Sequence, residues 1–283
     1  MEKSKGRIVG ALQEKWEFPS DHIPVGIVWS GIQIISWNVL NSSALGWILD
    51  KDVLGLKNSS IGRDNILSST PGISVREAKI IEMIITMTQT GHDLIAIQEC
   101  GIPFLRALQN GLVGSSYQII AIDKDDQWDQ NIVIFNIRCL EYLVTDSQTV
   151  FGIFSKKPKW GIQNLVFRDR QTNCRFRVIN TRLPGEPGNP APDEFAMYLN
   201  NQRDQTIAMG DMNITEIEME TVLANHQSKY RVIAPYCTNI EPYTYRSKSI
   251  DHFLVSDTCK VEIMTPNQVL IQPQLQIHVD LLK

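Results

Sequence analysis

Short apolar runs rich in β-branched residues recur along the chain, and they constrain its fold more than any other feature. Each run is too short for a typical helix and is bounded by turn-forming residues, which indicates strands. Few segments show apolar residues at helical spacing. The clearest is 74–90 (SVREAKIIEMIITMTQT), where Ser74 can cap the first turn. This pattern predicts a sandwich of two sheets with a few helices outside.

The pattern also sets the expected order of elements. Strands are expected at 23–29, 32–39, 93–98, 117–121, 131–135, 140–144, 165–167, 176–180, 205–209, 250–255 and 261–264. Further helices are expected at 103–111, 194–203 and 214–226, loops at 40–73 and 184–192, a helix or tail at 1–18 and extended chain at 269–282. The chain of 283 residues shows no repeat or linker, so we expect one domain, 1–283, with 1–18 as an N-terminal extension.

The first two expected strands are separated by a two-residue Ser-Gly turn, which predicts a β-hairpin. Trp29 should then lie opposite Ile32, and the hairpin should bring His22 and Asn38 to the same end of neighbouring strands. Strict alternation would place these two side chains on opposite faces. We therefore expect the pairing to loosen near His22, which Pro24 favours because proline interrupts a ladder.

Composition excludes several classes of function. The formal net charge of −4 argues against a strongly basic surface for nucleic acid. The five cysteines are odd in number and form no CxxC pair, so we expect neither a disulfide framework nor a zinc site. No apolar run reaches the roughly 18 residues of a membrane span, and the charged start lacks a signal-peptide core. A cytoplasmic location is expected, with secretion that needs no such peptide left open.

Polar side chains follow several apolar runs at the point where each run ends. Asn38 follows ISW, Glu99 follows LIAIQ, Asp211 and Asn213 follow TIAMG, and Asp251 follows SKSI. A sheet can aim such groups into one shared cleft. Carboxylate and amide oxygens suit a hard cation, Mg²⁺ or Mn²⁺. The alternative is that these residues form turns at different corners of the fold.

The ordered segments ISWNVLN, DLIAIQE, VINTRLP, AMGDMN and SIDHFLVS resemble motifs of the endonuclease/exonuclease/phosphatase, or deoxyribonuclease I-like, superfamily. The resemblance covers residues 32–256 in the order of that family. It implies an α+β fold, a four-layer α/β/β/α sandwich of two mixed, mainly antiparallel sheets. It also implies a Mg²⁺-dependent hydrolase, in which water attacks a phosphodiester or phosphomonoester in line.

The resemblance further implies an SDHxP motif, carrying a catalytic histidine, after the segment SIDHFLVS. Residues 257–283 contain no such string. The string occurs near the other end of the chain, as Ser20-Asp21-His22-Ile23-Pro24. We therefore expect a circularly permuted member of this fold, opened in the loop before the last strand of the family and with that strand joined to the first.

The family's metal and substrate residues map onto this chain by motif. Glu99 would be the principal Mg²⁺ ligand, assisted by Asn38, with Asp21 near the metal. Tyr245 matches a position where an aromatic residue lines the substrate pocket. Arg182 departs from the family, since many members carry histidine there to bind the scissile phosphate. Arginine can still bind phosphate through its fork, but it cannot give up a proton, which puts the turnover rate and the type of substrate in doubt.

The resemblance assigns the remaining roles to four residues. Asp211 would orient or deprotonate the attacking water, and Asn213 would hold a phosphate oxygen. His22 would stabilise the charge that develops on the phosphorus centre. Asp251 would accept the other ring N–H of His22 and so fix its tautomer. Arg76, at the start of the long helix, either pairs with a carboxylate near the site or lies on a solvated face.

Three functions remain open from the sequence. An active hydrolase would act on a nucleic acid end, a nucleotide, or a phospholipid or inositol phosphate head group, and the net acidity favours a small or single-stranded substrate over duplex DNA. A catalytically impaired member would keep the fold as a binding or scaffold protein, and the arginine at 182 is its support. A β-rich binding module with turn-forming Asp and Asn is the third.

Overall fold

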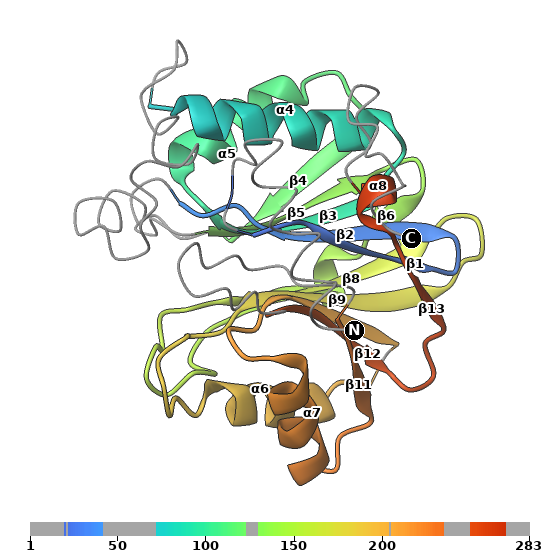
Figure 1. The fold of residues 1–283 in the computed structure, drawn as a ribbon. Helices are drawn as coiled ribbons and strands as arrows, with labels where there is room; N and C mark the ends of the chain where they lie inside the picture. Colours follow the sequence, from blue (N-terminus) through green and yellow to red (C-terminus); the bar gives the residue numbers. More distant parts are fainter. Residues whose placement is uncertain are drawn as a thin grey trace, which may run out of the picture.

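The computed structural model describes residues 20, 22–41, 72–122, 130–203, 205–234 and 250–269. Two sheets pack face to face, and helices lie on both outer faces (Figure 1). One sheet is covered by α4 (Val75–Gln89) and α5 (Ile102–Gly111), the other by α6 (Ala191–Asn200) and α7 (Glu216–Asn225). The expected four-layer α/β/β/α sandwich of two mixed sheets is therefore confirmed.

The first sheet has six strands, which in chain order are β1 (Val25–Trp29), β2 (Ile32–Asn38), β3 (Leu94–Cys100), β4 (Tyr117–Ala121), β5 (Gln130–Asn136) and β13 (Val261–Ile263). Their order across the sheet is β13-β1-β2-β3-β5-β4. The pair β2–β3 is parallel, and the other neighbours are antiparallel.

The second sheet has seven strands, which are β6 (Leu140–Tyr142), β7 (Gln148–Val150), β8 (Ile162–Asp169), β9 (Arg175–Arg182), β10 (Thr206–Asp211), β11 (Tyr230–Ile233) and β12 (Asp251–Ser256). Their order is β11-β12-β10-β9-β8-β6, with β7 beside β8. The sequence pattern missed β7 and β11, together with the short helices η2 (Val144–Asp146) and α8 (Pro266–Val269). All four are only three or four residues long, too short to show a period.

A parallel pair lies inside each sheet, and this determines where functional side chains gather. Strands β2 and β3 run parallel in the first sheet, and β9 and β10 run parallel in the second. The carboxyl ends of parallel strands lie at the same edge of a sheet. Because β10 contacts both β2 and β3, and β9 contacts β3, the four strands meet across the interior. Their carboxyl ends form one end of the sandwich.

Aromatic and aliphatic side chains fill the space between the sheets. Trp29 of β1 packs on Phe176 of β9 with ring centroids 4.7 Å apart, and Phe135 of β5 packs on Phe167 of β8 at 5.2 Å. All four rings are at most 2% exposed. A second apolar cluster, which includes Phe195, lies between the outer face of the seven-stranded sheet and the helices α6 and α7. This packing sets the distance across which the strand ends face one another.

The start of α4 follows the capping chemistry that its sequence predicts. The Ser74 side chain accepts from the backbone N–H of Glu77, and the Glu77 side chain returns a contact to Ser74, so the predicted cap of α4 is confirmed. The start of α6 was predicted wrongly. This helix begins at Ala191 and not at Glu194, because Pro192 fits the first helical turn, where no N–H partner is needed.

The predicted hairpin of β1 and β2 is confirmed in its register. Trp29 lies opposite Ile32, and the ladder runs without a shift to Val25 opposite Ser36. The paired residues end there, before His22 is reached. The loosening expected near His22 is therefore present, and the histidine is not bound by the alternation of the strand.

Some expectations fall outside the described residues. These are the helix or tail at 1–18, most of the loop at 40–73 and the extended chain at 270–282, together with the site residues Asp21 and Tyr245. Within the described residues, no helix combines the length and the apolar character that a membrane crossing requires.

At Gly210, β10 approaches β9 so closely that a side chain would not fit. Gly210 has φ +140°, and a Cβ atom there would overlap the carbonyl oxygen of Thr181. We predict that Gly210→Ala lowers the free energy of unfolding by about 3 kcal/mol, measured by urea denaturation. Gly114→Ala is the matched control, since Gly114 has φ +78° but open space around it, and should lose only about 1 kcal/mol. Equal losses in both variants would contradict the close-approach argument.

Candidate active site

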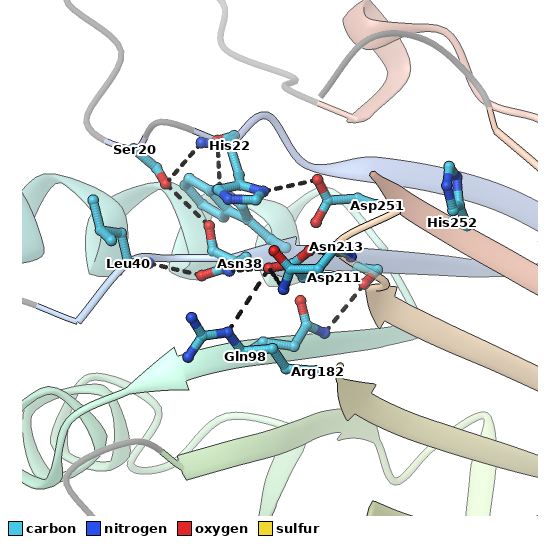
Figure 2. A network of polar contacts seen from close by, with 12 residues as sticks. Ser20, His22, Asn38, Leu40, Gln98, Arg182, Asp211, Asn213, Asp251 and His252 are labelled. Atoms are coloured by element: carbon cyan, nitrogen blue, oxygen red, sulfur yellow. Dashed lines mark hydrogen bonds and ion pairs between the residues drawn. The ribbon is translucent and has the colours of Figure 1, made fainter. Parts of the chain in front are cut away.

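The four strand ends bring together Asn38 of β2, Glu99 of β3, Arg182 of β9 and Asp211 of β10. Asn38, Arg182 and Asp211 are seen together in Figure 2. Asn38, Glu99 and Asp211 are buried. The Asn38 side chain donates from Nδ2 to Glu99 Oε1 at 2.6 Å and to Asp211 Oδ2 at 3.1 Å. Its Oδ1 accepts from the backbone N–H of Leu40 at 3.0 Å. One amide thus joins carboxylates from two different sheets.

Glu99 reaches this cluster because its strand is irregular. The pairing of β3 with β5 shifts register between Ile97 and Cys100. Glu99 itself has φ +58°, in the left-handed region. Leu40 and Asn213, which follow two other strand ends, have φ +55° and +53°. Such conformations persist where the surrounding structure holds them, and they gather at functional sites.

The histidine motif is fastened to the end of β2. Ser20 Oγ donates to the backbone oxygen of Asn38 at 3.0 Å and accepts from the backbone N–H of His22 at 3.2 Å. Trp37 Nε1 donates to the backbone oxygen of His22 at 3.0 Å. His22 is buried. These three contacts fix the motif beside Asn38, where the sequence placed it.

His22 and Asp251 form a buried pair, although 229 positions separate them along the chain. The Nδ1 atom of His22 lies 2.8 Å from Asp251 Oδ2. Asp251 stands opposite Asp211 in the antiparallel ladder of β12 and β10. A carboxylate at Nδ1 favours the proton on that nitrogen, which directs Nε2 to other partners. The predicted meeting of the two ends of the chain is present in the structure.

The Asp211 carboxylate is hydrogen-bonded and strongly affected by its burial. Its Oδ1 accepts from the backbone N–H of Asn213 at 2.9 Å, and Oδ2 accepts from Nδ2 of the same residue at 3.0 Å. Burial raises the pKa of Asp211 to about 7; the neighbouring Asp251 and Glu99 add to the rise, while His22 opposes it.

The Asn213 side chain already makes hydrogen bonds within the site. Its Nδ2 donates to the backbone oxygen of Leu183 at 2.7 Å as well as to Asp211. A Cβ atom on Gly185 would lie 2.6 Å from Asn213 Oδ1, so glycine makes room for this side chain. To hold a phosphate oxygen, as the resemblance implies, Asn213 would have to open one of these bonds.

Arg182 lies against the carboxylates. Its Nε is 2.8 Å from Glu99 Oε1 and 3.8 Å from Asp211 Oδ2. On its other side, the guanidinium carbon lies 5.0 Å from the centre of the Trp160 ring. The arginine therefore sits between an acidic cluster and an aromatic face.

A buried polar bridge next to the site was not predicted from the sequence. Asn180 of β9 accepts from Gln98 Nε2 at 2.8 Å and donates to Gln163 Oε1 at 2.9 Å. All three side chains are fully buried. The available signal was the presence of three polar residues inside otherwise apolar runs. Because Asn180 precedes Arg182 by two positions on β9, the bridge steadies the strand that presents the arginine.

The sequence left two alternatives for Arg76, a pair with a carboxylate or a solvated face. Arg76 is fully buried, so the alternative of a solvated face is wrong. Its Nη1 donates to the backbone oxygen of Val39 at 2.8 Å, and Nη2 donates to that of Leu40. Arg76 therefore supports the turn that follows Asn38, as a structural residue.

His252, next to Asp251, faces away from the site, as its place on the strand predicts (Figure 2). Its Nε2 lies 2.9 Å from the backbone oxygen of Ile214, and burial lowers the pKa of the ring, which favours the neutral form.

The described part of the chain contains no group of three or more His, Cys, Asp or Glu arranged to hold a metal ion. The site nevertheless presents oxygen ligands from Glu99, Asp211 and the neighbouring amides. Mg²⁺ is commonly held by one or two carboxylates, with water and substrate phosphate completing its shell. The donor set therefore fits Mg²⁺ or Mn²⁺ in its chemistry, although Glu99 Oε1 is engaged by Asn38 and Arg182.

The raised pKa of Asp211 predicts a pH dependence of stability. The folded protein holds this proton up to about pH 7, whereas an unfolded aspartate loses it near pH 3.9. The stability that the protonated form contributes is present below about pH 4 and is lost as pH rises to about 7. In metal-free protein, the unfolding temperature of Asp211→Asn relative to the parent should therefore rise between pH 4 and pH 7. The lost hydrogen bonds add an offset, so a flat difference across this range would count against the raised pKa.

No family model and no curated protein sequence matches the chain. Solved structures do match. ANGEL2, a 2′,3′-cyclic phosphatase solved with adenosine-2′,3′-vanadate, is 12% identical with a TM-score of 0.57, over 86% of this chain and 91% of that one. The human Nocturnin catalytic domain, solved with a sulfate anion, is 14% identical with a TM-score of 0.54, over 90% and 91%.

An endonuclease/exonuclease/phosphatase family protein from Bacteroides thetaiotaomicron is 17% identical with a TM-score of 0.51, over 64% of this chain and 75% of that one. At these identities the likeness concerns the fold. Together with the two mixed sheets and their outer helices, it shows that this chain has the fold of the endonuclease/exonuclease/phosphatase superfamily.

Proposed function

We propose that the chain is a metal-dependent phosphoester hydrolase that uses Mg²⁺ or Mn²⁺. The observation that carries the proposal is the meeting of His22 and Asp251 with Asn38, Glu99 and Asp211 at one end of the sandwich. ANGEL2, which is a 2′,3′-cyclic phosphatase, has a similar fold, and this supports the proposal. A fold alone does not determine function, so the argument depends on these side chains.

Glu99 would hold the cation, assisted by Asn38. A bound divalent ion would offset the negative charge of the phosphoester. Asn38 keeps Glu99 and Asp211 at a fixed separation through its two donated bonds. From the resemblance alone, we expect Asp21 near the metal and Tyr245 in the substrate pocket.

Asp211 would orient the attacking water and take its proton. A base works best when its pKa lies near the working pH, and burial brings the pKa of Asp211 to about 7. The contacts from Asn213 aim the carboxylate, so we assign Asn213 to orienting Asp211 before phosphate binding.

His22 would meet the charge that develops on the phosphoryl oxygens. The Asp251 contact at Nδ1 stabilises the imidazolium and holds the ring in place. Arg182 would bind a phosphate oxygen through its fork. The groups together supply positive charge on one side and a positioned water on the other, as in-line attack requires.

A binding or scaffold protein with the same fold is the second candidate. The ion pair of Arg182 with Glu99 favours it, since the proposed metal ligand is already engaged by a cation. Measurable hydrolysis by the parent would exclude this candidate. Binding of a phosphorylated molecule without turnover would support it.

Substitution of the central groups tests the hydrolase proposal. With Mg²⁺ and bis-p-nitrophenyl phosphate, we predict that Glu99→Ala and His22→Ala each lower kcat/KM by about 10²- to 10⁴-fold. The matched controls are Glu141→Ala and His226→Ala, whose side chains pair at the surface with Arg168 and Asp193. Both controls should keep parental rates. The proposal fails if Glu99→Ala and His22→Ala also do so.

A screen of RNA, DNA, nucleotides and phospholipids, each measured beside Glu99→Ala, would then identify the substrate class. The acidic net charge leads us to expect small or single-stranded substrates over duplex DNA.

We also propose the circular permutation. Strand β1, which follows the histidine motif, lies between β2 and β13 and is antiparallel to both. A short connection could therefore reach β1 from either neighbour. A chain that starts at β2, with the histidine motif and β1 placed after β13, should fold to the same unfolding temperature within a few degrees and recover the site. Failure of that chain to fold would contradict the proposed permutation.

A further inference from the structure

The place beside Glu99 that a divalent cation would take is held by a side chain of the protein itself. Arg182 Nε lies 2.8 Å from Glu99 Oε1. Glu99 is 4% exposed as a side chain and Arg182 is 27% exposed. The pair is thus shielded on the carboxylate side and open to solvent on the guanidinium side. A charge pair of this kind is stronger than an exposed one, because less water screens it.

The arginine can move only as a side chain. Arg182 pairs with Asp211 in the ladder of β9 and β10, and Asn180 fixes the same strand through Gln98 and Gln163. The backbone of β9 is therefore held by β10 at residue 182 and by the polar bridge at residue 180. The guanidinium can leave Glu99 only by rotation about its own side-chain bonds.

The Trp160 ring contacts the guanidinium of Arg182 on the side away from Glu99. The ring centre lies 5.0 Å from the guanidinium carbon, within the range of a cation–π contact. This attraction depends on the face of the ring and not on Glu99. Arg182 therefore keeps one favourable contact when the carboxylate is withdrawn, and its N–H fork becomes available to a phosphate oxygen.

We propose that Arg182 is an internal competitor for the divalent cation, which neutralises Glu99 in the metal-free protein and turns along Trp160 toward the substrate phosphate when a cation binds Glu99. This inference rests on the proposed function. It assigns a regulatory role to the position where the chain departs from the histidine of its family. The consequence is a weaker metal site in the resting protein, and an arginine that is released to the phosphate when metal is present.

Cation affinity tests this without measuring activity. Mn²⁺ binding to the full chain would be followed by electron paramagnetic resonance for the parent, Arg182→Ala, Arg182→His and Glu99→Ala. We expect Arg182→Ala to bind Mn²⁺ about tenfold more tightly or better, since tenfold corresponds to about 1.4 kcal/mol. Arg182→His should fall between it and the parent. The matched control is Arg175→Ala, which removes the same charge from the same strand at a surface pair with Asp146 and should bind like the parent.

The outcomes separate this inference from the proposed function. Equal Mn²⁺ affinity in the parent, Arg182→Ala and Arg182→His, with binding lost in Glu99→Ala, would overturn the competition and leave the hydrolase proposal standing. Absence of Mn²⁺ binding in every variant would overturn both. An equal gain in Arg175→Ala would reduce the effect to net charge and also overturn the competition.

Trp160 supplies a second measurement on the same protein. Mg²⁺ should change the parent's tryptophan emission, and the change should vanish in Trp160→Phe and in Arg182→Ala, because each removes one side of the contact. An unchanged response in both variants would show that the guanidinium does not leave Glu99 along the ring.

Discussion

The two bonds that the Asn38 amide donates, to Glu99 in its own sheet and to Asp211 in the other, are the contact on which the site depends. They can form because each sheet contains a parallel pair whose carboxyl ends lie at the same end of the sandwich. The aromatic packing between the sheets sets their separation, and Gly210 lets β10 approach β9. The geometry of a few polar atoms therefore follows from the packing of the whole core.

Backbone conformation converts these strand ends into a site. Leu40, Glu99 and Asn213 all adopt left-handed φ values, which are unfavourable for residues with a side chain. Each is held by a specific contact: Arg76 binds the backbone oxygen of Leu40, Asn38 binds Glu99, and Asn213 binds the backbone oxygen of Leu183. These three residues lie at or next to the ends of β2, β3 and β10, where Asn38, Glu99 and Asp211 contact one another.

The sequence predicted what local chemistry determines. The Ser-Gly turn specified the hairpin register, because a two-residue loop allows few alternatives, and this placed His22 near Asn38. It did not reveal the bridge of Gln98, Asn180 and Gln163, nor the ion pair of Glu99 with Arg182. Those contacts depend on which distant strands become neighbours, and no local pattern encodes that choice. β11 was missed for a different reason, since four residues are too few to show a period.

The charge balance of the site connects its stability with its chemistry. Among the residues that the structure describes, the buried carboxylates Glu99, Asp211 and Asp251 contact or lie near Arg182 and His22. Within this set of five groups, full ionisation of the carboxylates leaves one negative charge in excess even when the histidine is protonated. Buried excess charge is unfavourable unless a carboxyl keeps its proton or a cation enters. The raised pKa of Asp211, caused first by its burial, is the response available to the protein alone. Binding of a divalent cation would be the other response. Arg182 then affects which of the two occurs, because its positive charge already neutralises Glu99 and a metal ion must displace it.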